Sequence, residues 1–212
     1  MHPFTKKDLI FSVITGLITG FAAWQIFNFL DVAKFQDISF AWFLLLVPVL
    51  WIVGVNLGYL LGKWLTFFNQ FGKFAAIGFT NAAVDFGVLN FLIANTGTTA
   101  GVWYSVFKAI SFISAVIPSY FWNKYWAFSA GGGSASGGEV LEGGGVFEFT
   151  KFVSVAVVSI FINTGVASLV VNFIDPVLGF DVRVWANVGA VTGSAVALIF
   201  SFVGFKLAVF KK

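Results

Sequence analysis

Residues 152–174 read FVSVAVVSIFINTGVASLVVNFI, a stretch without a single charged side chain between Lys151 and Asp175. An α-helix needs about 20 predominantly apolar residues to cross the hydrocarbon core of a bilayer, so this stretch is long enough for one span. Five further stretches share this length and character: residues 9–30, 39–62, 74–94, 102–122 and 184–205. We therefore expect an all-α integral membrane protein with six transmembrane helices.

The composition of the whole chain excludes a water-soluble globule. Of its 212 residues, 59% are hydrophobic and 10% are charged, whereas soluble domains carry about 25% charged residues. The chain has no cysteine and one histidine, His2, which argues against thiolate or histidine metal sites and against Ser-His-Asp catalysis. We expect no metal, no other cofactor, no nucleic-acid partner and no enzymatic activity, since a lone central carboxylate is little catalytic apparatus.

The basic residues predict the orientation of the six spans. Cytoplasmic loops of membrane proteins carry an excess of lysine and arginine. Two basic residues, Lys34 and Arg183, fall on the side opposite the termini. Nine fall on the side of the termini: Lys6, Lys7, Lys63, Lys73, Lys124, Lys151, Lys206, Lys211 and Lys212. Both termini are therefore predicted to be cytoplasmic in a multi-pass protein of the cytoplasmic (inner) membrane.

Spans three and four have an internal copy in spans five and six. Lys73-Phe74 aligns with Lys151-Phe152, Asp85 with Asn163, and Val102-Trp103 with Val184-Trp185. An even number of spans in each copy gives both copies the same orientation, so we expect two parallel two-helix repeats. Between the copies, residues 129–147 are rich in glycine and are predicted to form a flexible cytoplasmic loop.

Small residues recur at helical spacing on several spans. They form the patterns Gly16-x-x-x-Gly20, Gly54-x-x-x-Gly58-x-x-x-Gly62 and Gly189-x-x-x-Gly193. Such residues let helix backbones approach closely inside a bilayer. The pattern leaves open whether they join spans of one chain or two chains, so a homodimer is one arrangement that it allows.

Two ionisable residues fall inside predicted spans. Asp85 lies near the middle of span three, and Lys108 lies about two turns inside the outer end of span four. Each costs about 2.5–3.5 kcal/mol at the centre of a membrane helix, so we expect them to pair with one another. One interpretation is that the pair only fixes helix register; the other makes Lys108 an anion partner that Asp85 positions.

Amide and aromatic side chains complete the set of candidate binding residues. Asn81, Asn163 and Asn187 could hydrogen-bond a hydroxylated ligand, although interhelical amide contacts are also ordinary packing. The run from Tyr120 to Phe128 combines aromatic residues with Lys124, which is typical of anchoring at the membrane interface. Lys73, Lys124, Lys151 and Lys206 could also gather where they would attract a lipid phosphate.

From about residue 71 onward the chain resembles the GtrA-like family of small four-span membrane proteins. The likeness is carried by Phe71-Gly-Lys-Phe74, Asn81, Asp85-Phe-Gly87, Asn90-Phe91, Lys108, Ser119–Phe128 with Asn123, Lys124 and Trp126, Lys151-Phe152, Asn163 and Phe202–Phe210. The resemblance implies a four-helix domain over residues 71–212, preceded by a two-helix membrane extension over residues 1–66. The two extra spans could add a dimer surface or cover a lateral opening.

The resemblance also implies a role in the synthesis of cell-envelope polysaccharides. Members are proposed to flip polyprenyl-phosphate-linked sugars across the cytoplasmic membrane, with membrane lipids as their partners. The candidate substrate-binding residues are then Asp85, Lys108, Asn81, Asn163, Asn187, Asn123, Lys124 and Trp126. Two alternatives stay open: an adaptor that recruits or stabilises a glycosyltransferase without transport, and a small cation exporter using Asp85.

Overall fold

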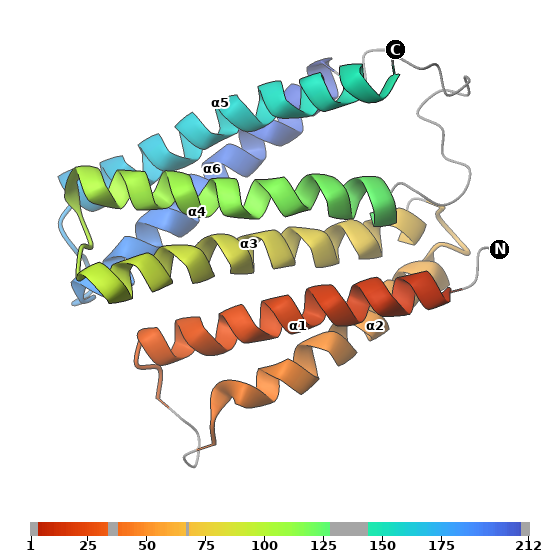
Figure 1. Cartoon of the computed structure of the whole chain (residues 1–212), viewed down its shortest axis with the longest axis horizontal. Helices are drawn as coiled ribbons and strands as arrows, with labels where there is room; N and C mark the ends of the chain where they lie inside the picture. The colour runs from red at the N-terminus through yellow and green to blue at the C-terminus, as the bar shows by residue number, and fades with distance from the viewer. Residues whose placement is uncertain (1–3, 34–37, 67, 128–143, 209–212) are drawn as a thin grey trace. The chain divides into compact units, whose positions relative to one another are not determined.

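The computed structural model describes residues 4–33, 38–66, 68–127 and 144–208, and in these ranges the chain is helical without a β-strand (Figure 1). Two short elements accompany the long helices: the 3-10 helix η2 (Phe40–Trp42) and the π-helical turn η3 (Asn123–Ala127). The six long helices are α1 (Lys6–Phe29), α2 (Phe43–Leu61), α3 (Phe68–Thr96), α4 (Gly101–Trp122), α5 (Gly144–Phe173) and α6 (Val182–Ala208). The prediction of an all-α membrane protein is confirmed.

Within the described residues, five segments are long and apolar enough to cross a membrane. They are Lys6–Phe29, Phe40–Leu61, Phe71–Thr96, Gly101–Ala127 and Val153–Phe173. Helix α6 forms where the sixth span is expected, but it is not among these five, so its passage through the membrane stays a prediction. Helix α5 begins at Gly144, inside the segment predicted as a loop, and residues 128–143 of that loop fall outside the described ranges.

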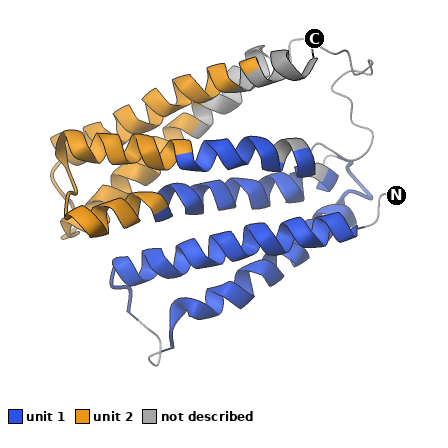
Figure 2. Cartoon of the chain, viewed as in Figure 1, with its two compact units in different colours: residues 1–87, 114–133 blue, residues 88–113, 134–212 orange. Residues whose placement is uncertain are grey.

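Figure 2 shows the two compact units of the chain, and each is described below by itself. Unit 1 comprises residues 1–87 and 114–133, and unit 2 comprises residues 88–113 and 134–212. Helices α3 and α4 are therefore each divided between the two units. The predicted domains, 1–66 and 71–212, divide the chain differently and stay a prediction.

In unit 1, small residues bring α1, α2 and α3 close together. A Cβ atom added at Gly16 would lie 2.5 Å from the Cα atom of Pro48, and one added at Gly20 would collide with the carbonyl of Phe43. A Cβ atom at Gly58 would lie 2.8 Å from the carbonyl oxygen of Phe68. Gly16, Gly20 and Gly58 thus join helices of one chain here, whereas a Cβ atom at Gly54 would meet nothing within 4 Å.

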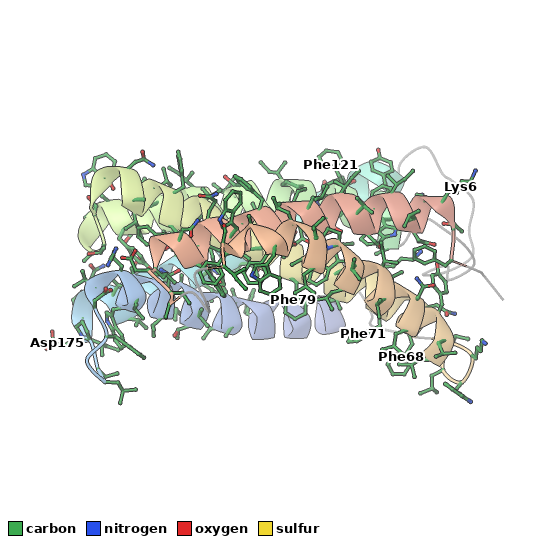
Figure 3. The ribbon with its side chains drawn as sticks, turned by 90° about the horizontal axis from the view of Figure 1, so that it is seen from below. Lys6, Phe68, Phe71, Phe79, Phe121 and Asp175 are labelled. Atoms are coloured by element: carbon green, nitrogen blue, oxygen red, sulfur yellow. The ribbon has the colours of Figure 1, made fainter. Side chains whose placement is uncertain are left out.

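The lipid-facing surface of unit 1 is aromatic and aliphatic. Figure 3 shows Phe68, Phe71 and Phe79 following one another along α3. The side chains of Phe71 and Phe79 are exposed, as is Phe121 on α4. Exposed apolar side chains are unfavourable in water but suit the hydrocarbon of a bilayer, so this surface agrees with membrane insertion.

In unit 2, α5 packs against α6, again with close contacts at glycines. A Cβ atom at Gly193 would collide with the carbonyl of Asn163, and one at Gly189 would lie 2.9 Å from the carbonyl oxygen of Ala167. The short connection from α3 to α4 uses Gly97 at φ 70° and Gly101 at φ 78°. Only glycine adopts these left-handed conformations without steric cost, which permits the tight reversal between the two helices.

Candidate functional site

The two ionisable residues predicted inside spans are both buried. Asp85 on α3 is 4% exposed and Lys108 on α4 is 0% exposed. The hydroxyl of Ser111 donates to the backbone carbonyl of Lys108 at 3.0 Å. Asp85 belongs to unit 1 and Lys108 to unit 2, and their mutual pairing stays a prediction.

Asn81 lies one turn before Asp85 on α3 and binds the neighbouring helix. Its amide nitrogen donates to the hydroxyl of Ser119 on α4 at 2.7 Å. Both residues belong to unit 1. The contact ties α3 to α4 by a neutral hydrogen bond close to the buried carboxylate.

Asn163 and Asn187 make corresponding contacts in unit 2. The amide nitrogen of Asn163 on α5 donates to the hydroxyl of Ser194 on α6 at 3.0 Å. Its amide oxygen is buried and has no hydrogen-bond partner among the described residues. Asn187 on α6 exchanges two hydrogen bonds with Asn90 on α3, of 2.7 Å and 2.8 Å.

Further neutral hydrogen bonds join the helices of unit 2. The hydroxyl of Tyr104 donates to the carbonyl of Ala186 at 2.8 Å. The hydroxyls of Ser105 and Ser168 lie 2.6 Å apart, and the backbone N–H of Gly101 donates to the side-chain oxygen of Asn172. Hydroxyl and amide groups therefore supply several of the described polar contacts of this unit.

Trp126 is placed differently from the prediction of an interface anchor. Its side chain is 0% exposed, lies in a cluster with Val55, Ala76 and Ile77, and stacks on Phe11 with ring centroids 5.4 Å apart. The anchoring interpretation is therefore wrong for Trp126. Its neighbour Tyr125 is exposed and still suits that role.

The adjacent candidates Asn123 and Lys124 belong to the π-helical turn η3. Their side chains, like those of Lys151 and Lys206, fall outside the described part of the structure. Their part in substrate binding, and that of Trp126, stays a prediction.

The carboxylate of Asp8 in unit 1 binds several groups at once, and its role is not among the sequence predictions. One of its oxygens, Oδ1, accepts from Lys73 Nζ at 2.7 Å and from the indole N–H of Trp126 at 3.0 Å. The other, Oδ2, accepts from the Tyr59 hydroxyl at 3.0 Å, and from the backbone N–H and hydroxyl of Thr5 at 3.0 Å and 2.8 Å. We call Asp8, Lys73, Tyr59 and Trp126 the Asp8 network.

The Asp8 network gives Lys73 a protein partner that its sequence does not predict. This lysine is buried and pairs with Asp8, and its ammonium lies 5.3 Å from the ring centroid of Tyr59; its attraction for a lipid phosphate stays a prediction. A signal for Asp8 was present in the sequence. Thr5 precedes it by three residues, the spacing of a capping box, and the structure forms that box at the start of α1.

A second polar cluster was also missed. The hydroxyl of Thr80 on α3 receives a hydrogen bond from Thr19 on α1 at 3.0 Å and one from the indole of Trp51 on α2 at 3.4 Å. Thr80 itself donates to the carbonyl of Ala76 at 2.8 Å. The first three helices of unit 1 are therefore joined by hydrogen bonds as well as by glycine contacts.

The comparisons with known proteins give one family. The family model described as the GtrA/DPMS transmembrane domain matches residues 73–210. Neither a curated protein nor a solved structure matches the chain. The matched region includes Lys73, Asp85, Lys108, Trp126 and Asn163, and it begins after α1 and α2 have ended.

Proposed function

The chain belongs to the GtrA/DPMS transmembrane-domain family, and from this we propose that it flips a polyprenyl-phosphate-linked sugar across the cytoplasmic membrane for cell-surface polysaccharide synthesis. The domain implies a role in the flipping of such lipids or in glycosylation at membranes. The protein would move its substrate without changing the substrate's bonds. The apolar tail would stay in the lipid, while the phosphate and the sugar would need polar partners on the way.

The observation that carries this proposal is the complete burial of Lys108 in a membrane helix of the family domain. An amine inside a membrane helix costs free energy on insertion, and residues of this kind mark substrate or ion pathways. A lysine ammonium is also a strong partner for a phosphate oxygen. We assign Lys108 the role of phosphate partner, and its pairing with Asp85 stays a prediction.

The amides support the handling of a sugar. Asn81, Asn163 and Asn187 all bind hydroxyl or amide groups on neighbouring helices. A sugar hydroxyl offers the same donor and acceptor as a serine hydroxyl, so it can replace such a partner with little change in hydrogen bonding. The partnerless amide oxygen of Asn163 can accept a further hydrogen bond from the sugar.

A transport assay tests the proposal. The purified protein is placed in vesicles with a fluorescent polyprenyl-phosphate sugar, and a membrane-impermeant reagent reports how much of the head group reaches the outer leaflet. The substitution Lys108→Met keeps the apolar stem and removes the charge. Because a hydrogen bond to a charged group contributes about 1.5–3 kcal/mol, flipping should slow roughly tenfold or more.

The control is Lys63→Gln, since Lys63 is exposed and follows the end of α2. This variant should flip the lipid at the rate of the unaltered protein. Equal rates for Lys108→Met and the unaltered protein would contradict the proposal. Absence of any flipping, with binding to a co-expressed glycosyltransferase that survives Lys108→Met, would instead favour the adaptor alternative.

A further inference from the structure

The Asp8 network has the composition of an anion-binding site. Three of its donors come from outside α1: the Lys73 ammonium, the Tyr59 hydroxyl and the Trp126 indole N–H. They bind the two oxygens of one carboxylate at 2.7–3.0 Å. Charge-assisted hydrogen bonds of this length are strong, and the same donors suit the non-bridging oxygens of a phosphate ester.

The position of the network along the helices matches the depth of lipid head groups. Asp8 lies near the start of the candidate span Lys6–Phe29, and Lys73 near the start of Phe71–Thr96. Tyr59 lies near the end of Phe40–Leu61, and Trp126 near the end of Gly101–Ala127. The four side chains thus meet where membrane helices reach the interface, which is also where lipid phosphates reside.

The carboxylate sits on the part of α1 that can leave most easily. Asp8 is in the first turn of the helix, and Thr5 caps that turn. The ends of helices open at much lower free-energy cost than their middles. Release of Asp8 therefore requires only the first turn to open, while Lys73, Tyr59 and Trp126 stay on their own elements.

We propose that Lys73, Tyr59 and Trp126 form an anion-binding socket, that the Asp8 carboxylate fills this socket, and that the phosphate of a membrane lipid competes with Asp8 for it. The choice of a lipid phosphate as competitor rests on the proposed function, whereas the socket itself rests on the geometry. The tethered carboxylate holds the socket closed to weakly bound anions because its effective concentration there is high. A phosphate ester enters when it binds these donors more strongly than Asp8 does.

The first experiment empties the socket and offers it an anion. Asp8→Ala is purified in a neutral detergent, and its thermal unfolding is followed with inorganic phosphate or with sodium chloride at equal ionic strength. Phosphate should raise the midpoint by several degrees through mass action, and chloride should not. The effect should vanish in Asp8→Ala combined with Lys73→Gln, because the ammonium that holds the anion is gone.

Two further variants keep the test decisive. Thr5→Ala removes the helix cap but leaves the Asp8–Lys73 ion pair, so its midpoint should be lowered without any specific response to phosphate. Asp8→Asn keeps the shape of the side chain while removing its charge. If Asp8→Ala does not fold, the thermal unfolding with phosphate and chloride is measured on Asp8→Asn instead. Absence of phosphate-specific stabilisation in both Asp8 variants would overturn the socket.

A second experiment separates a lipid from a free anion. Asp8→Ala is titrated in micelles with a polyprenyl phosphate and with the corresponding uncharged polyprenol, and bound lipid is counted by native mass spectrometry. We expect binding of the phosphate lipid to increase at least tenfold over the unaltered protein, and binding of the alcohol to stay the same. Stabilisation by inorganic phosphate without this increase would overturn the lipid as competitor.

The result is independent of the transport assay. A protein that shows the Lys73-dependent phosphate response but flips no lipid would retain the socket and refute the proposed function. A protein that flips lipid but shows no phosphate response would refute the socket and retain the proposed function.

Discussion

The two compact units hold their helices together by different chemistry. In unit 1, a buried carboxylate on α1 receives hydrogen bonds from α2, α3 and η3 and pairs with a buried ammonium. In unit 2, several of the described contacts between helices are made by neutral amides and hydroxyls, with the Asn90–Asn187 pair joining α3 to α6. Full charges make the contact in unit 1 costly to break unless another anion replaces the carboxylate, because one partner left alone would be an uncompensated charge. The neutral contacts of unit 2 cost less to exchange, which suits the proposed handling of a sugar.

The largest expected effect comes from removing one member of the charged contact. Asp8→Ala leaves the Lys73 ammonium buried without its partner, and Lys73→Met does the same to Asp8. Each should lower the free energy of unfolding by about 3 kcal/mol or more. Reversible unfolding in mixed micelles measures this, and the double substitution should cost less than the sum of the two.

Thr5→Ala is the matched control, because it removes a cap worth about 1 kcal/mol and leaves the ion pair intact. If Asp8→Ala costs no more than Thr5→Ala, the charged contact is not what distinguishes unit 1.

The next largest effect is expected at the close glycine contacts, which both units contain. Gly16→Ala in unit 1 and Gly193→Ala in unit 2 each place a methyl group against the backbone of a neighbouring helix. Overpacking of this kind costs about 1–3 kcal/mol, so both variants should unfold more readily. Gly54→Ala and Gly165→Ala are the controls, since no atom lies within 4 Å of their added methyl groups. Equal stability of test and control variants would show that the helices can separate freely at these contacts.

A smaller effect is expected at the neutral pair. Asn90→Ala and Asn187→Ala should each lower the free energy of unfolding by about 0.6 kcal/mol and by no more than about 1.7 kcal/mol, the average and the maximum for interhelical hydrogen bonds in a membrane. The double variant should lose little more than one single variant, because both remove the same contact. Asn95→Ala is the control, since this exposed amide bonds only to the carbonyl of Phe91 in its own helix. A loss as large as that of Asp8→Ala would remove the contrast between the units.

The smallest effect is expected at the start of α6. Asp181 accepts hydrogen bonds from the backbone N–H groups of Val184 and Arg183, and the Val184 bond is the first cause that lowers the pKa of the carboxyl. A lowered pKa stabilises the fold above the unfolded value of about 3.9, and this contribution is lost as pH falls through the folded value. Asp181→Asn should therefore unfold with less dependence on pH below about 4, as followed by circular dichroism. An unchanged pH profile would mean that the cap is not formed.

The helices and their close contacts were predictable from the sequence. Apolar length alone places the membrane helices, since a bilayer admits few other backbone structures. The spacing of the glycines at positions 16, 20, 189 and 193 indicates close helix packing, but it does not identify the helix that each glycine contacts. The structure supplies that answer for α1 with α2 and for α5 with α6.

The polar contacts were predictable only in part. The burial of Asp85 and Lys108 follows from their position in apolar stretches. The hydrogen bond between Asn81 and Ser119 and the Asp8 network do not, because they join residues far apart in the chain whose meeting depends on helix rotation. Asp8 was overlooked because a charge near a span end usually faces water, whereas here three neighbouring elements cover it.

The distance along the chain between Asp8 and Trp126 has a consequence for biogenesis. The two residues are separated by 118 positions, and a ribosome adds roughly 5–20 residues per second. Roughly six seconds or more must therefore pass between translation of the carboxylate and translation of its last donor. Over that interval the first helix resides in the bilayer with its acidic end incompletely partnered. The Asp8 network is thus completed only after residue 126 has been translated, and a truncated product that ends before η3 would expose this defect to quality control.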